Sequence, residues 1–131
     1  MATLIHRPTI IAAAGMPPKQ IAEYVGRRSS ATEAVSIAHM VSPGGWSEPG
    51  QQPEFDEFTV VLRGVLAVDT HAGTHEVRAG QAVIVQKGEW VRYRTPDSEG
   101  AEYLSVCRPA FSPALVRRDA PSAVDTINQG R

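Results

Sequence analysis

Short runs that alternate between apolar and polar residues fill the middle of the chain, and glycine recurs between them. This alternation places every second side chain on the same face of a strand. Short strands separated by turns that contain glycine are typical of an all-β sandwich or barrel. The runs predict strands at 35–41, 55–62, 65–69, 74–77, 82–85, 90–94 and 103–107.

Two of the predicted turns lie in the centre of this series. Arg63-Gly64 separates the second predicted strand from the third, and Ala72-Gly73 separates the third from the fourth. Glycine adopts the left-handed backbone of a tight turn without steric cost. We therefore expect the chain to reverse direction at both dipeptides.

The first thirty-four residues have a different pattern. The segment 4–14 is apolar and favours β structure around Pro8, which suits an edge strand or a strand exchanged with a second copy. The sequence Pro-Pro-Lys-Gln-Ile-Ala-Glu-Tyr-Val-Gly at 17–26 predicts a short helix that begins at the prolines and ends at Gly26. Its buried stripe would consist of Ile21, Tyr24 and Val25.

These patterns divide the chain into three parts. We expect an N-terminal arm at 1–34 that forms part of a dimer, a barrel at 35–111, and a polar tail at 112–131. The tail carries two prolines and little apolar pattern, so we expect it to be partly disordered or to lie along the surface.

Length and charge limit the classes of function. A chain of 131 residues is one domain that can bury a core without disulfides. Thirteen basic and fourteen acidic residues give a net charge of -1, which argues against nucleic-acid or anionic-membrane binding. The single cysteine, Cys107, is expected to be a small buried residue on the last strand. With no leader or apolar span visible, a cytoplasmic location is expected.

The segment from Gly45 to Gly64 resembles the first motif of the cupin family. That motif has a glycine, a His-x-His pair, a glutamate and a second glycine at fixed spacing. Gly45, Glu57 and Gly64 match it, while the two histidine positions hold Gln51 and Pro53. The resemblance implies an all-β, cupin-type jelly-roll barrel.

The second cupin motif has a glycine, a Pro-x-Gly group and a further histidine. Gly80 and Gly88 match, whereas Gln86 replaces the proline and Val91 replaces the histidine. Two segments of the barrel, Phe-Asp-Glu-Phe-Thr-Val-Val-Leu-Arg-Gly and the later Gly-Gln-Ala-Val-Ile-Val-Gln-Lys-Gly, are most similar to the ethanolamine-utilisation EutQ group, which also lacks the histidines.

Alternation along the strands places positions 51, 53, 57 and 91 toward the barrel lumen. One carboxylate and one neutral amide are too few donors for Fe, Mn, Ni or Zn. We therefore expect no transition metal and no cofactor.

Glu57 and Tyr93 are the candidate catalytic residues. A carboxylate among apolar lumen residues can carry a proton, and an inward phenol can donate to Glu57 or to a ligand oxygen. The alternative is structural: Glu57 would accept hydrogen bonds from Gln51, Tyr93 or water, and Tyr93 would be a core residue.

Five residues are candidates for ligand binding. His39 shares a face with Ile37 and Val41, so a half-buried structural role is its alternative. The two tryptophans are expected to flank the barrel mouth, although packing at a dimer contact would also explain them. The candidate ligand-binding residues are Glu48, Gln51, His39, Trp46 and Trp90.

Two functions remain open. The favoured one is a small-molecule-binding cupin without the usual metal. The other is a metal-independent isomerase, cyclase or lyase that acts on a small carbonyl or carboxylate compound, with Glu57 as general acid or base. Outward Phe58, Val60 and Leu62 on the same strand also lead us to expect a homodimer, in which exchanged N-terminal strands would cover this face.

Overall fold

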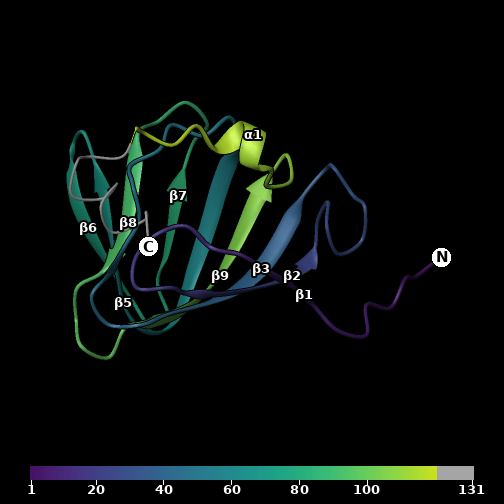
Figure 1. The fold of residues 1–131 in the computed structure, drawn as a ribbon, viewed down its shortest axis with the longest axis horizontal. Helices are drawn as coiled ribbons and strands as arrows, with labels where there is room; N and C mark the ends of the chain where they lie inside the picture. The colour runs from purple at the N-terminus through teal and green to yellow at the C-terminus, as the bar shows by residue number, and fades with distance from the viewer. Residues whose placement is uncertain (121–131) are drawn as a thin grey trace.

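The structure is a computed structural model that describes residues 1–120, which form a curled antiparallel barrel (Figure 1). The all-β jelly-roll prediction is confirmed. The elements of this part of the chain are β1 (Thr9–Ile11), β2 (Gln20–Val25), β3 (Ser36–Ser42), β4 (Trp46–Ser47), β5 (Asp56–Thr70), β6 (Gly73–Arg78), β7 (Ala82–Val85), β8 (Val91–Thr95), β9 (Ala101–Arg108) and α1 (Pro113–Val116).

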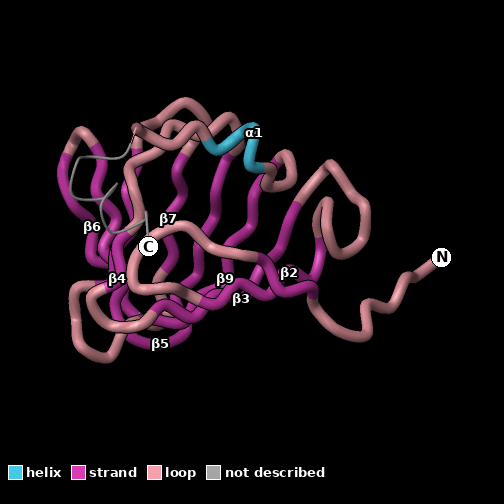
Figure 2. Tube along the Cα trace, in the orientation of Figure 1, coloured by secondary structure: helices cyan, strands magenta, loops and turns pink. Residues whose placement is uncertain are grey.

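The strands form two sheets that share β5. The first half of β5 pairs with β7 and β9 in a sheet that continues through β3 and β2 to β1. Its second half pairs with β6 and β8, and β8 also pairs with β4. The strands curl around a common interior (Figure 2). Each sheet therefore turns one face toward this lumen.

The predicted turn at Arg63-Gly64 is wrong, because β5 runs through it as one long strand. The register against β9 shifts between Val61 and Arg63, which is a β-bulge. Gly64 follows with a φ of 77°, and a Cβ there would lie 2.1 Å from the carbonyl oxygen of Gly100. The glycine thus bends the strand from one sheet into the other without reversing it.

The predicted N-terminal helix is also wrong, because Gln20–Val25 is strand β2. It pairs with β1 on one side and β3 on the other. A single short helix has little stability of its own, whereas these pairings satisfy the backbone of the segment on both sides. In the strand Ile21 and Glu23 face the lumen and Tyr24 is exposed, so the helical stripe does not form.

The N-terminal segment contributes an edge strand, as predicted. β1 pairs with β2 of its own chain. Residues 12–19, which are called the arm from here on, then leave the sheet, cross the open side of the barrel and return (Figure 2). Two backbone hydrogen bonds of 2.9 Å join Met16 to Ser47 on β4. This arm closes one side of the lumen.

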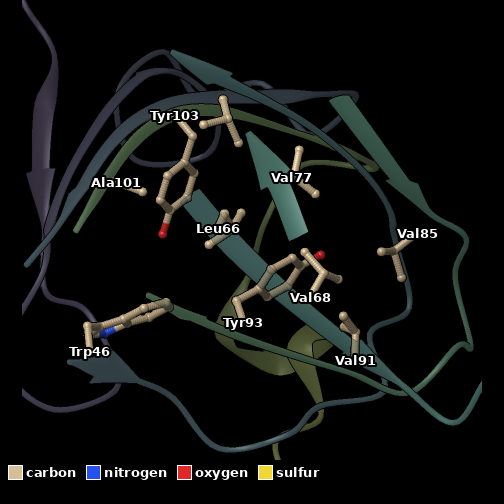
Figure 3. Packing of buried hydrophobic residues seen from close by; sticks show 10 residues of the cluster. Trp46, Leu66, Val68, Val77, Val85, Val91, Tyr93, Ala101 and Tyr103 are labelled. Carbon is tan, nitrogen blue, oxygen red and sulfur yellow. The ribbon is translucent and has the colours of Figure 1, made fainter. Parts of the chain in front are cut away.

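The main core fills the end of the barrel near β4, β6 and β8. Trp46, Tyr93 and Tyr103 project into it from three different strands (Figure 3). The aliphatic residues packed with them are Val61, Leu66, Val68, Val77, Val85, Val91 and Ala101.

The first part of the tail lies along the barrel. Ser112 caps α1, and Val116 packs against Phe55 and the buried Cys107. The predicted burial of Cys107 is confirmed. The rest of the predicted tail, 121–131, lies outside the described residues. In residues 1–120 no helix has the length and apolar character needed to cross a membrane.

Candidate ligand site in the barrel lumen

A cavity opens between the two sheets beneath the arm 12–19. Its empty space is about 730 Å³, part of which is open to solvent. Its apolar lining includes Ala38, Met40 and Phe55. The polar residues that line it include Lys19, Glu48, Gln51, Glu57, Thr59 and Tyr93.

Glu57 and Tyr93 meet in this cavity, as the alternation predicted. The Tyr93 hydroxyl donates a hydrogen bond of 3.0 Å to Oε1 of Glu57. The Ser105 hydroxyl donates a short hydrogen bond to Oε2. Burial, together with the charge of Glu57, raises the pKa of Tyr93, so the phenol remains a neutral donor. The carboxylate is therefore held in one orientation by two hydroxyl groups.

Lys19 and Glu48 form a second polar group in the lumen. The ammonium nitrogen of Lys19 lies 3.9 Å from Oε2 of Glu48, and the two side chains are 7% and 5% exposed. Burial raises the pKa of Glu48, although Lys19 opposes this shift. Burial alone would lower the pKa of Lys19, but Tyr103, Glu48 and Glu57 outweigh it and the pKa lies above its usual value. Lys19 is thus a buried cation.

Two polar atoms in the cavity wall have no hydrogen-bond partner within residues 1–120. They are Oε1 of Gln51 and Oγ1 of Thr59, on residues that are 4% and 1% exposed. The Gln51 backbone is fixed by two hydrogen bonds of 2.9 Å to Val91. Because buried polar groups are normally paired, these two atoms are available to a ligand.

The donors at the cupin metal positions do not fit a transition-metal centre. Val91 and Pro53 are buried and carry no donor, and Gln51 offers only a neutral amide. The part of the chain that the structure describes holds no group of three or more His, Cys, Asp or Glu side chains that could bind a metal ion. No chemical step is therefore assigned to a metal.

Three predicted ligand-binding residues do not line the cavity. His39 lies on the outer face of β3, where Nε2 is 2.6 Å from Oε2 of Glu102. Trp90 packs outside, donating a 2.9 Å hydrogen bond to Asp119. Trp46 is buried in the main core instead of flanking the mouth, and the Lys19 ammonium lies 4.3 Å from its ring centroid. Glu48 and Gln51 do line the cavity.

Several lining residues were missed by the sequence reasoning. Thr59 and Ser105 could have been found, because they alternate with Glu57 and Cys107 on their strands. Lys19 had no such signal, since the arm reaches the lumen only through tertiary contacts. Arg118 was assigned to the tail, yet hydrogen bonds between 50–52 and 117–119 bring it to the cavity rim.

Comparisons of sequence support the motif resemblance. The family model described as "Cupin domain" matches residues 38–107. The chain is also 41% identical over 103 residues to a protein named endoribonuclease YbeY from Myxococcus xanthus. That match covers 79% of this chain but 35% of the relative, so the chain spans about a third of that protein's length.

Solved structures with the same fold include the polyketide cyclase RemF from Streptomyces resistomycificus. It matches with a TM-score of 0.73 and 20% identity, over 98% of this chain and 94% of RemF. A predicted oxalate decarboxylase from Thermotoga maritima matches with a TM-score of 0.68 and 18% identity, over 83% and 99%. A putative EutQ from Salmonella typhimurium matches with a TM-score of 0.63 and 18% identity, over 80% of this chain and 98% of that protein. At these identities the likeness concerns the fold.

Proposed function

This chain belongs to the cupin domain family, and on that basis we propose that it binds a small organic molecule in its barrel lumen. The observation that carries the proposal is the pair of unpartnered buried oxygens, Gln51 Oε1 and Thr59 Oγ1, in the wall of the lumen cavity. They would accept hydrogen bonds from donor groups of the ligand, while the Tyr93–Glu57 pair supplies a further polar contact.

A variant that fills the lumen tests this proposal. Ala38 lines the cavity on β3, so Ala38→Phe places a ring in the ligand's space. We expect a screen of small carboxylates, carbonyl compounds and phenols to find compounds that raise the melting temperature of the wild type, because binding stabilises the folded state. The same compounds should have no effect on Ala38→Phe.

The matched control is Ala72→Phe, which adds the same ring at the exposed β5–β6 turn. Its ligand response should equal that of the wild type. Circular dichroism checks that both variants fold. A compound that stabilises Ala38→Phe as strongly as the wild type would place binding elsewhere and contradict a lumen site.

We further propose that this binding needs no transition metal, as the donors at positions 51, 53, 57 and 91 suggest. Elemental analysis of untagged protein is expected to find Fe, Mn, Ni and Zn well below one ion per chain. Prolonged treatment with a chelator should leave the melting temperature and ligand response unchanged. A stoichiometric metal whose removal abolishes ligand binding would contradict this part of the proposal.

A catalytic role is the second candidate, because the carboxylate of Glu57 lines the cavity. Two hydroxyl groups fix the carboxylate in the lumen, which suits proton transfer to or from a bound carbonyl compound. The full-length likeness to a polyketide cyclase supports a search among isomerisation, cyclisation and dehydration reactions. General acid or base catalysis contributes roughly 10²–10⁴-fold to a rate.

Glu57→Gln tests the catalytic candidate on compounds found by the lumen screen. Turnover should fall by about 100-fold or more while the compound still binds. Glu76→Gln is the control, since Glu76 is exposed on β6. Equal turnover in Glu57→Gln and wild type would exclude Glu57 as the proton carrier.

We do not extend the endoribonuclease name of the M. xanthus relative to this chain. The match covers 35% of that protein. A net charge of -1 is also unfavourable for binding a phosphate backbone.

We propose, finally, that the protein is a homodimer through the outer face of the β5–β7–β9 region. Outward residues of the paired strands β5 and β7 form this outer apolar face. Its most exposed members are Val60, Leu62 and Ile84. Large exposed apolar patches mark interaction sites. A net charge of -1 leaves little repulsion between two copies.

A further inference from the structure

Lys19 is a buried cation whose hydrogen-bonding capacity is not filled by the chain. An ammonium group has three N–H donors. Within residues 1–120 the Lys19 ammonium donates a hydrogen bond to Sδ of Met40 at 3.6 Å, and a thioether sulfur is a weak acceptor. The nearest carboxylate oxygen, Oε2 of Glu48, lies 3.9 Å away, beyond hydrogen-bond distance. A side-chain hydrogen bond with Tyr103 also raises the pKa of Lys19, so one of the three donors is left for a further oxygen.

Aromatic rings also hold this ammonium. Its nitrogen lies 4.3 Å from the ring centroid of Trp46 and 5.9 Å from that of Tyr103. Such cation–π contacts stabilise a desolvated charge. The arm carries Lys19 to this place, so the cation forms part of the lumen wall.

The other charged groups that face the lumen leave Lys19 free to bind an anion. Glu23 on β2 accepts hydrogen bonds of 3.1 and 2.9 Å from the backbone N–H groups of Arg28 and Ser29. Glu57 on β5 accepts from two hydroxyl groups. Arg118, at the rim, adds a second positive charge. Glu48 is therefore the one lumen carboxylate among the described residues without such hydrogen-bond donors.

Building on the proposed lumen function, we propose that Lys19 anchors the ligand and that the ligand is a small organic carboxylate. One carboxylate oxygen would accept from the remaining N–H donor of Lys19. Donor groups elsewhere on the ligand would meet Gln51 Oε1 and Thr59 Oγ1.

Glu48 adds a pH dependence to this arrangement. Because burial raises the pKa of its carboxyl, Glu48 can take up a proton when an anion enters beside it. The protonated form carries no repelling charge and can donate to the ligand. Tyr93 and Tyr103 stay neutral because burial raises the pKa of both phenols. Affinity for a carboxylate should therefore increase as the pH falls.

The experiment compares benzoate with benzamide, which has the same shape without the charge. In a Trp90→Phe background the fluorescence of Trp46 reports directly on the Lys19 environment, since Trp46 is then the sole tryptophan. We expect benzoate to change this emission saturably and benzamide to bind at least about tenfold more weakly, as expected for a charge-assisted hydrogen bond.

Substitutions at Lys19 and Glu48 give the decisive comparison. Lys19→Met keeps the length of the side chain and should weaken benzoate binding by about tenfold or more, whereas Lys19→Arg keeps the charge and should retain binding. Glu48→Gln should strengthen benzoate binding and remove its pH dependence. A purely structural role for Lys19 would change neither the charge preference nor the pH profile.

Three results would overturn the carboxylate assignment. They are equal benzoate affinity in Lys19→Met and its parent, equal affinity for benzoate and benzamide, and no response to either probe at millimolar concentration. In each case the ligand response of Ala38→Phe, compared with that of Ala72→Phe, still tests whether the lumen binds a small molecule. The failure of Lys19 as an anchor is thereby distinguishable from the failure of the proposed function.

Discussion

At the scale of single residues, Asp69 shows how one carboxylate joins three strands. On β5 it accepts hydrogen bonds from Thr74 of β6 at 2.6 Å and from Arg94 of β8 at 2.8 and 3.1 Å. Arg92 of β8 adds another at 3.1 Å. These donors, Arg94 above all, hold the pKa of Asp69 well below its usual range. Asp69 therefore stabilises the second sheet in its ionised form.

Replacing this carboxylate by an amide should destabilise the fold. We expect Asp69→Asn to lower the free energy of unfolding by about 1–2 kcal/mol, a modest value because both arginines are partly exposed to solvent. Urea denaturation at neutral pH measures the difference. Asp97→Asn, at an exposed turn, is the matched control and should change little.

The pH dependence of that difference has a definite sign. The folded-state pKa of Asp69 is depressed, so its contribution is complete above the unfolded value of about 3.9. It is lost as the pH falls below that value and the folded carboxylate takes up a proton. A difference between wild type and Asp69→Asn that grows toward acid pH would contradict this assignment.

Residues of the lumen differ in how well the sequence predicts them. The period of two on a strand was sufficient for Glu57 and Tyr93, and the same rule extends to Thr59 and Ser105. Lys19 precedes β2 and reaches the lumen because its arm crosses to β4. Local pattern does not encode that crossing, so the buried cation of the site was not predictable from the sequence.

At the scale of elements, the bend of β5 explains why one prediction failed. A glycine between two apolar runs predicts a turn, but the second run pairs with β6 and β8 in a new sheet. The bulge between Val61 and Arg63 redirects the strand by inserting one residue. Likewise, β2 was predicted as a helix from Pro17, Pro18 and Gly26, whereas its pairing with β1 and β3 makes it a strand. Both errors concern strand pairing.

Two glycine substitutions test the role of this bend. Gly64 and Gly80 both have positive φ, of 77° and 85°. A Cβ at Gly80 has open space, so Gly80→Ala should cost only the strain of the backbone, about 1 kcal/mol. A Cβ at Gly64 would lie 2.1 Å from the Gly100 carbonyl oxygen, and 3.0 Å from the Cα of Ala101.

Gly64→Ala must therefore displace the backbone of the facing segment as well. We expect a loss of stability at least about 2 kcal/mol larger than that of Gly80→Ala, in the range of overpacked sites, or failure to fold. Thermal and urea denaturation of the two variants provide the comparison. Equal losses would mean that the bend of β5 adapts easily to a side chain.

At the scale of the whole molecule, β5 presents apolar residues to both sides of its sheet. Val61 faces the core, while Val60 and Leu62 are 42% and 47% exposed on the outer apolar face. Ile84 of the adjacent β7 is 62% exposed. The expectation of apolar residues on this face is confirmed. Exchange of N-terminal strands is not required to cover β1, since it already pairs with β2.

The dimer proposal predicts that a charge on this face separates the two copies. A symmetric dimer places the same patch on both sides of the interface, so each substitution acts twice. We expect sedimentation at micromolar concentration to give a dimer for the wild type and a monomer for Leu62→Glu and Ile84→Glu. Leu4→Glu, before β1, should remain dimeric because the proposed interface does not need a strand exchange. A monomeric wild type would remove the proposal, whereas a dimer broken only by Leu4→Glu would move the interface to the N-terminal segment.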